Sequence, residues 1–131
     1  MWCWPKPEQS GGPPVLMGAW SKWAPKRIAE YCDGWLPIDA AYAGGGACPD
    51  LAGAMEAIRS ELLRSGRSID GFDFSVVTAE ELAPPSVGLE ARIRELLKLG
   101  FNRVVFLVFP AAINKQRPLL DRYATLIRNF A

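Results

Sequence analysis

The residues best placed for binding chemistry follow the first apolar run of the chain. That run, PVLMG at 14–18, leads through Gly18, Ala19, Trp20 and Ser21 into a helical segment. Free N–H groups and the helix dipole at a helix N-terminus favour an anion such as a phosphate. The alternative is that Gly18 only makes the turn from strand to helix. The spacing therefore indicates either an anion site or a simple turn.

The other residues that could form a site give weaker indications of one. The run Gly44–Gly46 could form a nest of backbone N–H groups, but no Lys-Ser or Lys-Thr follows it, and a connecting loop is the alternative. The chain has no histidine, which excludes Ser-His-Asp and Cys-His pairs and the His-containing zinc sites. We predict no metal site and no catalytic residue. The three cysteines, Cys3, Cys32 and Cys48, are expected to be free thiols of a reducing cytoplasm.

Hydrophobic periodicity predicts an α/β fold of four strand–helix units. Short apolar runs bounded by turn residues predict parallel, buried strands near residues 14–18, 35–38, 73–77 and 104–109. Helical spacing between and after these runs predicts four helices on the same pattern.

Caps and breakers set the expected helix limits. Ser21 is expected to cap the first helix, which should end at Tyr31 or Cys32, and Ser86 is expected to cap the third. Gly66 and Gly100 should end the second and third helices, and the last helix should begin near Pro118. The predicted inner positions are Leu51, Ala54, Met55, Ile58 and Leu62 in the second helix, Leu89, Ile93, Leu96 and Leu97 in the third, and Leu119, Tyr123, Leu126, Ile127 and Phe130 in the fourth.

Composition favours one domain over residues 1–131. Half of the residues are hydrophobic, 22% are charged and the formal net charge is +1, values that are typical of a soluble globular protein. The basic residues are spread along the chain, which argues against a nucleic-acid binder. No apolar run is long enough to span a membrane and no secretion signal precedes the first strand, so a cytoplasmic protein is expected.

Three segments carry a family resemblance. They are WCWPKPEQSGGPPVLMGAWSKWAPKRIAEYCDGWLPI at 2–38, GFDFSVV at 71–77 and GFNRVVFLVFP at 100–110. They resemble the C-terminal half of the bacterial luciferase-like monooxygenases, a family of flavin- or deazaflavin-dependent (β/α)8 barrels. The resemblance implies FMN or a deazaflavin as cofactor, bound at Gly18, Ala19, Trp20 and Ser21. Ala19 stands where a second glycine is common in that family, and bulky Trp20 follows it.

A half barrel leaves two sheet edges and one apolar face uncovered. The simplest solution is a homodimer that closes an eight-stranded ring, although a separate N-terminal half or a flattened sheet would also serve. Four of the five tryptophans, Trp2, Trp4, Trp20 and Trp23, fall in the first 23 residues, which favours an interface or a cover over ligand stacking. We therefore predict a truncated luciferase-like protein without autonomous catalysis that retains flavin or deazaflavin binding. The alternative is a non-catalytic structural or interaction subunit.

Overall fold

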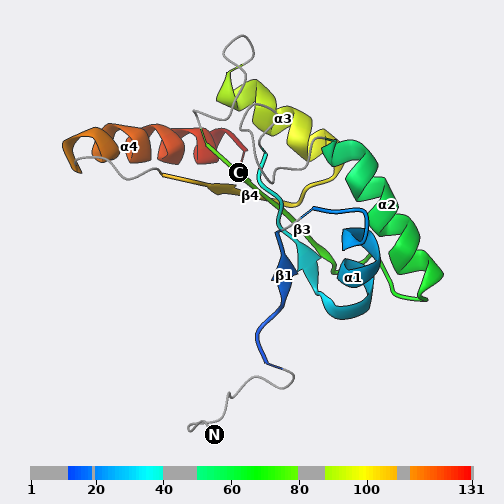
Figure 1. Ribbon diagram of the computed structural model, residues 1–131. Helices are drawn as coiled ribbons and strands as arrows, with labels where there is room; N and C mark the ends of the chain where they lie inside the picture. The colour runs from blue at the N-terminus through cyan, green and yellow to red at the C-terminus, as the bar shows by residue number, and fades with distance from the viewer. Residues whose placement is uncertain (1–11, 19, 40–49, 80–87, 109–112, 131) are drawn as a thin grey trace, which may run out of the picture.

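Four parallel strands, each followed by a helix, form one sheet in the computed structural model (Figure 1). The structure describes residues 12–18, 20–39, 50–79, 88–108 and 113–130. The elements are β1 (Leu16–Met17), α1 (Ala24–Tyr31), β2 (Gly34–Trp35), α2 (Leu51–Arg64), β3 (Asp73–Thr78), α3 (Leu89–Leu99), β4 (Arg103–Phe106) and α4 (Ile113–Phe130). The predicted α/β alternation is confirmed, and each strand lies within two residues of its expected start.

The strands lie side by side in sequence order, β1-β2-β3-β4, and every neighbouring pair is parallel. Met17 lies opposite Trp35, Trp35 opposite Phe74, and Val76 opposite Val104. Because crossovers between parallel strands are right-handed, a sheet that always advances in one direction places all of its helices on one side. Figure 1 shows this arrangement as an arc that runs from α1 and α2 through α3 to α4. Single winding of this kind is the topology of a barrel segment, whereas doubly wound sheets reverse direction.

The main core lies between the sheet and the arc of helices. Trp35, Phe74 and Val76 project from the strands into it, each at most 3% exposed. All five predicted inner positions of α2 are buried against them. A second cluster joins α3 to α4 through Leu89, Ile93, Tyr123 and Leu126.

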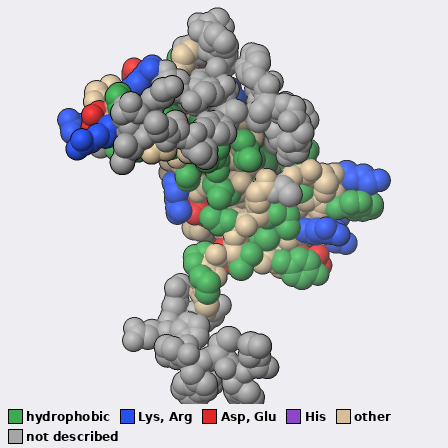
Figure 2. Space-filling view, turned by 60° about the vertical axis from the view of Figure 1, so that its left-hand side comes forward, with side chains coloured by type: hydrophobic (Ala, Val, Ile, Leu, Met, Phe, Trp, Pro, Cys, Tyr) green, Lys and Arg blue, Asp and Glu red, His purple; other side chains and the backbone are tan. Residues whose placement is uncertain are grey.

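The opposite side of the sheet carries no helix of the described residues, and we call it the open face. Because strand side chains alternate between the two sides, the residues next to the core positions point to it. They are Leu16, Leu36, Ile38, Asp73, Ser75, Val77, Arg103, Val105 and Leu107. Figure 2 shows hydrophobic side chains gathered over the middle of the molecule, with charged side chains on either side.

The two ends of the open face differ in chemistry. At the amino-terminal ends of the strands, Arg103 Nη2 lies 2.6 Å from Asp73 Oδ2, and the Ser75 hydroxyl donates a hydrogen bond to the same carboxylate. At the carboxyl-terminal ends the side chains are apolar. Ile38, which bridges to Val77, is 46% exposed, and Val105 on the edge strand β4 is 39% exposed. The open face is therefore polar at one end and uncovered and apolar at the other.

The expected helix starts are wrong in three places. Trp23 occupies the N-cap of α1 with no side-chain capping bond, while the Ser21 carbonyl accepts a turn bond from the Ala24 N–H at 2.9 Å. Gly88 occupies the N-cap of α3, and Ser86 lies outside the described residues. The last helix begins at Ile113 and contains Pro118.

Two predicted inner positions are also wrong, and the glycine stops are confirmed. Leu97 is 40% exposed and Ile127 is 55% exposed, so both face away from the core. The periodic pattern gave each helix one apolar position more than its core-facing stripe accommodates. Gly66 and Gly100 follow α2 and α3 with φ of +72° and +104°, the left-handed conformation in which glycine ends helices.

Candidate functional site

The predicted binding segment lies at the carboxyl end of β1, beside the corresponding end of β2. A Cβ on Gly18 would lie 2.9 Å from the backbone carbonyl oxygen of Leu36, closer than ordinary contacts allow. A glycine is therefore needed here because the two backbones approach each other. This contact favours the turn interpretation of Gly18, and it also leaves the glycine exposed at the end of the sheet where ligands of parallel α/β proteins bind.

The other described residues of the predicted binding segment are divided between core and surface. The half-buried ring of Trp20 packs against Trp35, with ring centroids 5.9 Å apart and planes tilted by 53°. Ser21 is exposed, and Ala19 lies outside the described residues. The structure thus brings Gly18 and Ser21 to the surface, while Trp20 contributes to the edge of the core.

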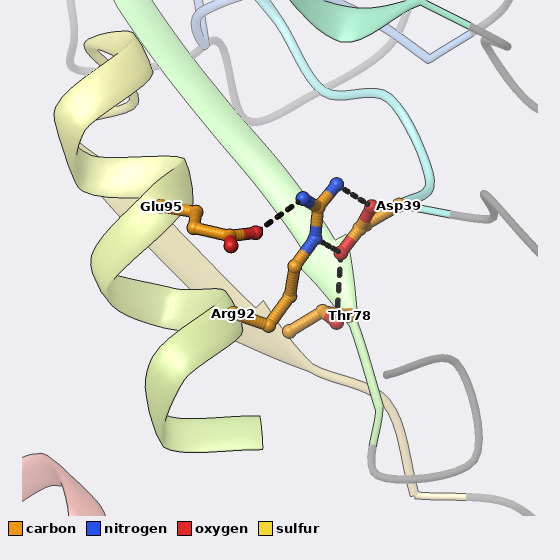
Figure 3. A network of polar contacts seen from close by, with 4 residues as sticks. All are labelled: Asp39, Thr78, Arg92 and Glu95. Atoms are coloured by element: carbon orange, nitrogen blue, oxygen red, sulfur yellow. Dashed lines mark hydrogen bonds and ion pairs between the residues drawn. The ribbon is translucent and has the colours of Figure 1, made fainter. Parts of the chain in front are cut away.

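A buried polar network, which the sequence did not reveal, lies at the same end of the sheet (Figure 3). Asp39 follows Ile38, which forms an isolated bridge to Val77 beyond the end of β2, and Thr78 ends β3. The Arg92 guanidinium of α3 donates from Nε to one oxygen of Asp39 at 2.9 Å and from Nη2 to the other at 2.7 Å. Its Nη1 donates to Glu95 at 2.9 Å, and the Thr78 hydroxyl lies 3.5 Å from Asp39.

Burial and charge make this network a clamp. The Asp39 side chain is 1% exposed and that of Arg92 is 17% exposed. The hydrogen bonds to Asp39 raise the pKa of Arg92 above its ordinary value by more than burial lowers it, and Glu95 raises it further. Arg92 therefore stays charged, and all three of its nitrogens donate to carboxylates. Two carboxylates offset this single positive charge, so the network does not attract an anion, and its physical effect is to hold α3 to the end of β3 and to the segment that follows β2.

One signal in the sequence points to Asp39. A charged residue directly after the apolar stretch 35–38 lies where the loops of parallel strands converge, and such residues are candidates for a site or a buried pair. Arg92 gives no comparable signal, because α3 carries several charges and only tertiary packing selects one of them.

One of the three cysteines expected to be free thiols lies among the described residues. Cys32, which ends α1, is a buried free thiol. Burial raises the pKa of Cys32, and the nearby charge of Asp33 adds to the effect. A thiol held in its neutral form is a poor nucleophile. Several residues considered in the sequence lie outside the described part of the chain, namely Cys3, Cys48, Gly44–Gly46, Trp2 and Trp4.

Two further observations apply to the part of the chain that the structure describes. There, no group of three Cys, Asp or Glu side chains is arranged to hold a metal ion. No helix there has the length and apolar character needed to cross a membrane.

No protein-family model, curated protein or solved structure matches this chain. The resemblance to luciferase-like monooxygenases consequently remains a prediction from the sequence segments.

Proposed function

We propose that this chain is a half-barrel subunit, related to the luciferase-like monooxygenases, that works as a homodimer without catalysis of its own. The observation that carries the proposal is the apolar end of the open face, where Ile38, Val105 and Leu107 are exposed together on one sheet. Contiguous apolar surface on a soluble protein marks a site of association. A second copy is the simplest partner, because a two-fold axis covers both surfaces at once.

The distribution of polar groups also supports a role without catalysis. On the helix side, Asp39, Thr78 and Arg92 are hydrogen-bonded to one another. On the open side, the described residues at the carboxyl ends of the strands are Leu36, Ile38, Val77, Val105 and Leu107, none of which titrates. General acid–base catalysis needs a titratable group within hydrogen-bonding reach of the substrate. The geometry therefore fits an interface better than a reaction centre.

The oligomeric state tests the proposal. Light scattering coupled to size exclusion should give twice the 14.4 kDa chain mass at micromolar concentration. Replacement Ile38→Asp or Val105→Asp should weaken the association at least about tenfold, because an unpaired carboxylate in an apolar interface is costly.

The matched control is Leu63→Asp, since Leu63 is 64% exposed on α2 and lies away from the open face. This variant should keep the dimer. A compact species of one chain mass for the unaltered protein, stable over this concentration range, would contradict the proposal.

Flavin or deazaflavin binding is the second candidate function. The observation in its favour is that exposed Gly18 lies at the same end of the sheet as the apolar part of the open face. A planar ring could lie on that apolar surface while a phosphate meets the segment from Gly18 to Ser21.

Titration with FMN, a deazaflavin and lumiflavin, which lacks the phosphate, tests this function. Saturable quenching of tryptophan fluorescence is expected, tighter for FMN than for lumiflavin if the phosphate meets Gly18–Ser21. Trp20→Phe should reduce the quenching amplitude while leaving the fold intact. A response that only rises linearly with each ligand would rule out the binding function and leave the dimer untouched.

A further inference from the structure

From the positions of the exposed apolar side chains we infer how two copies join: β4 of each chain pairs in parallel with β1 of the other, and α4 of each packs against α1 of the other. This inference rests on the proposed homodimer and deepens it. The alternative is that two sheets stack face to face, which would also cover the open faces but would leave the edges and these helices free.

The first observation concerns the exposed large apolar residues of the described chain. They fall mainly in three places: the β1 and α1 end of the sheet, the open face, and α4 at the other end. They are Val15, Trp23 and Tyr31; Ile38, Val105 and Leu107; and Leu120 and Ile127. Only Leu63 and Leu97, on the middle helices, lie elsewhere. Stacking of sheets would cover the second group alone, whereas edge-to-edge closure covers all three.

The second observation concerns the strand edges. Val15 and Met17 direct their backbone carbonyls to β2, where they accept from Asp33 and Leu36. In a parallel strand the residue between them, Leu16, must then direct its N–H and C=O to the outer edge. On β4 the Leu107 N–H bonds to Thr78 of β3 at 2.7 Å, so by the same alternation Val104 and Phe106 direct their N–H and C=O groups outward. Each edge therefore presents backbone donors and acceptors with which a parallel strand can pair.

The third observation is the height at which one exposed side chain lies along each of the two helices α1 and α4. Tyr31 lies seven residues after the start of α1 at Ala24, and Leu120 lies seven residues after the start of α4 at Ile113. Both helices follow their strands from the same end of the sheet, and each residue advances a helix by about 1.5 Å. Tyr31, 71% exposed, and Leu120, 52% exposed, are therefore the exposed apolar side chains that the proposed closure brings to the same height on its two adjoining helices.

Charge adds a further expectation. Residues 22–31 hold three basic and one acidic residue, and residues 113–130 hold four basic and one acidic. Both helices are net positive, so their contact must be apolar and is opposed by repulsion. Since salt screens charges that lie more than a Debye length apart, the dimer should become tighter as salt is raised. An interface held by ion pairs would instead loosen.

Site-directed cross-linking tests the geometry. In a background with Cys3→Ser, Cys32→Ala and Cys48→Ser, chains carrying Tyr31→Cys are mixed with chains carrying Leu120→Cys and oxidised. The mixed disulfide should form about tenfold faster than in a mixture of Leu63→Cys with Leu120→Cys, because juxtaposition raises the effective concentration of the thiols. Light scattering also gives the molar mass of the species in each mixture, so that association and geometry are measured separately.

The outcomes separate the two proposals. Fast cross-linking of the 31 and 120 positions, together with tighter association in high salt, supports edge-to-edge closure. A dimer in which these positions cross-link no faster than the control pair, or in which 120 joins 120 preferentially, overturns the closure but keeps the homodimer. A species of single-chain mass overturns the homodimer and the closure with it.

Discussion

Replacing Arg92 with methionine is expected to lower the free energy of unfolding by about 3–5 kcal/mol, because removing one partner of a buried ion pair leaves the other uncompensated. The group left behind is the carboxylate of Asp39, which is 1% exposed and, among the described residues, would keep the Thr78 hydroxyl at 3.5 Å as its one side-chain partner. Methionine retains most of the buried volume of the side chain, so the loss reports on charge and hydrogen bonds. Urea denaturation at one fixed protein concentration measures it.

The matched control is Arg94→Met on the same helix. Arg94 is 57% exposed and pairs with the half-exposed Glu90 at 2.8 Å, and exposed pairs contribute little to stability. This substitution should cost less than about 1 kcal/mol.

Adding Asp39→Leu to Arg92→Met should recover much of the loss, since an apolar replacement of both partners removes the stranded charge. Equal effects of the two arginine substitutions would show that Asp39 and Arg92 do not form the buried clamp.

Replacing Trp35 with alanine is expected to cost about 3–5 kcal/mol, as for other large aromatic residues removed from a core. Trp35 has no exposed surface, and its ring lies 5.8 Å from that of Phe101 and 5.9 Å from that of Trp20. Alanine would leave a cavity between these rings where β2 meets its helices. Thermal or urea denaturation followed by circular dichroism measures the change.

The matched variant Trp35→Phe should cost clearly less. No acceptor among the described residues lies within hydrogen-bonding distance of the buried Trp35 Nε1, and a buried donor without a partner is itself destabilising by about 1–3 kcal/mol. Phenylalanine keeps an aromatic ring and removes that donor. A loss as large as that of alanine would mean that the indole N–H is hydrogen-bonded in solution.

Strand positions and their order could be predicted because the signal is local. The apolar run VVFLVF at 104–109 predicts a strand buried on both sides. The structure confirms a strand there, β4, but not its burial, because Val105 and Leu107 are 39% and 37% exposed on the open face. Alternation with helices leaves few topologies besides a parallel sheet. The buried positions of α2 followed from spacing for the same reason. The half barrel and its completion by a second copy stay predictions, which the uncovered open face supports and the single chain does not test.

Helix starts were harder, because capping depends on where the preceding loop enters. Ser21 has the side chain of a good N-cap, yet Trp23 takes that position within the turn that the Ala24 N–H closes on the Ser21 carbonyl. In α4, an early start at Ile113 places Pro118 inside the helix, where proline is usually a breaker. For both α1 and α4, the residue preferences therefore predicted the helix correctly and its first residue wrongly.

The candidate site shows the same difference between local signals, which the sequence carries, and long-range contacts, which it does not. Gly18 was found from its place between a strand and a helix, and its close approach to Leu36 explains the glycine. The contact between Asp39 and Arg92 joins residues 53 positions apart, and no local pattern carries information over that distance.

Sequence-order pairing of the strands has a consequence for the way the chain acquires its structure during synthesis. Because each strand pairs only with its neighbours in the sequence, every newly emerged unit finds its partner already in place. The loops to be closed stay short, which favours rapid folding and N-terminal units that form first. The bond between Asp39 and Arg92 is an exception to this order. It waits until α3 has left the ribosome, so the segment after β2 is tethered only when the third strand–helix unit is complete.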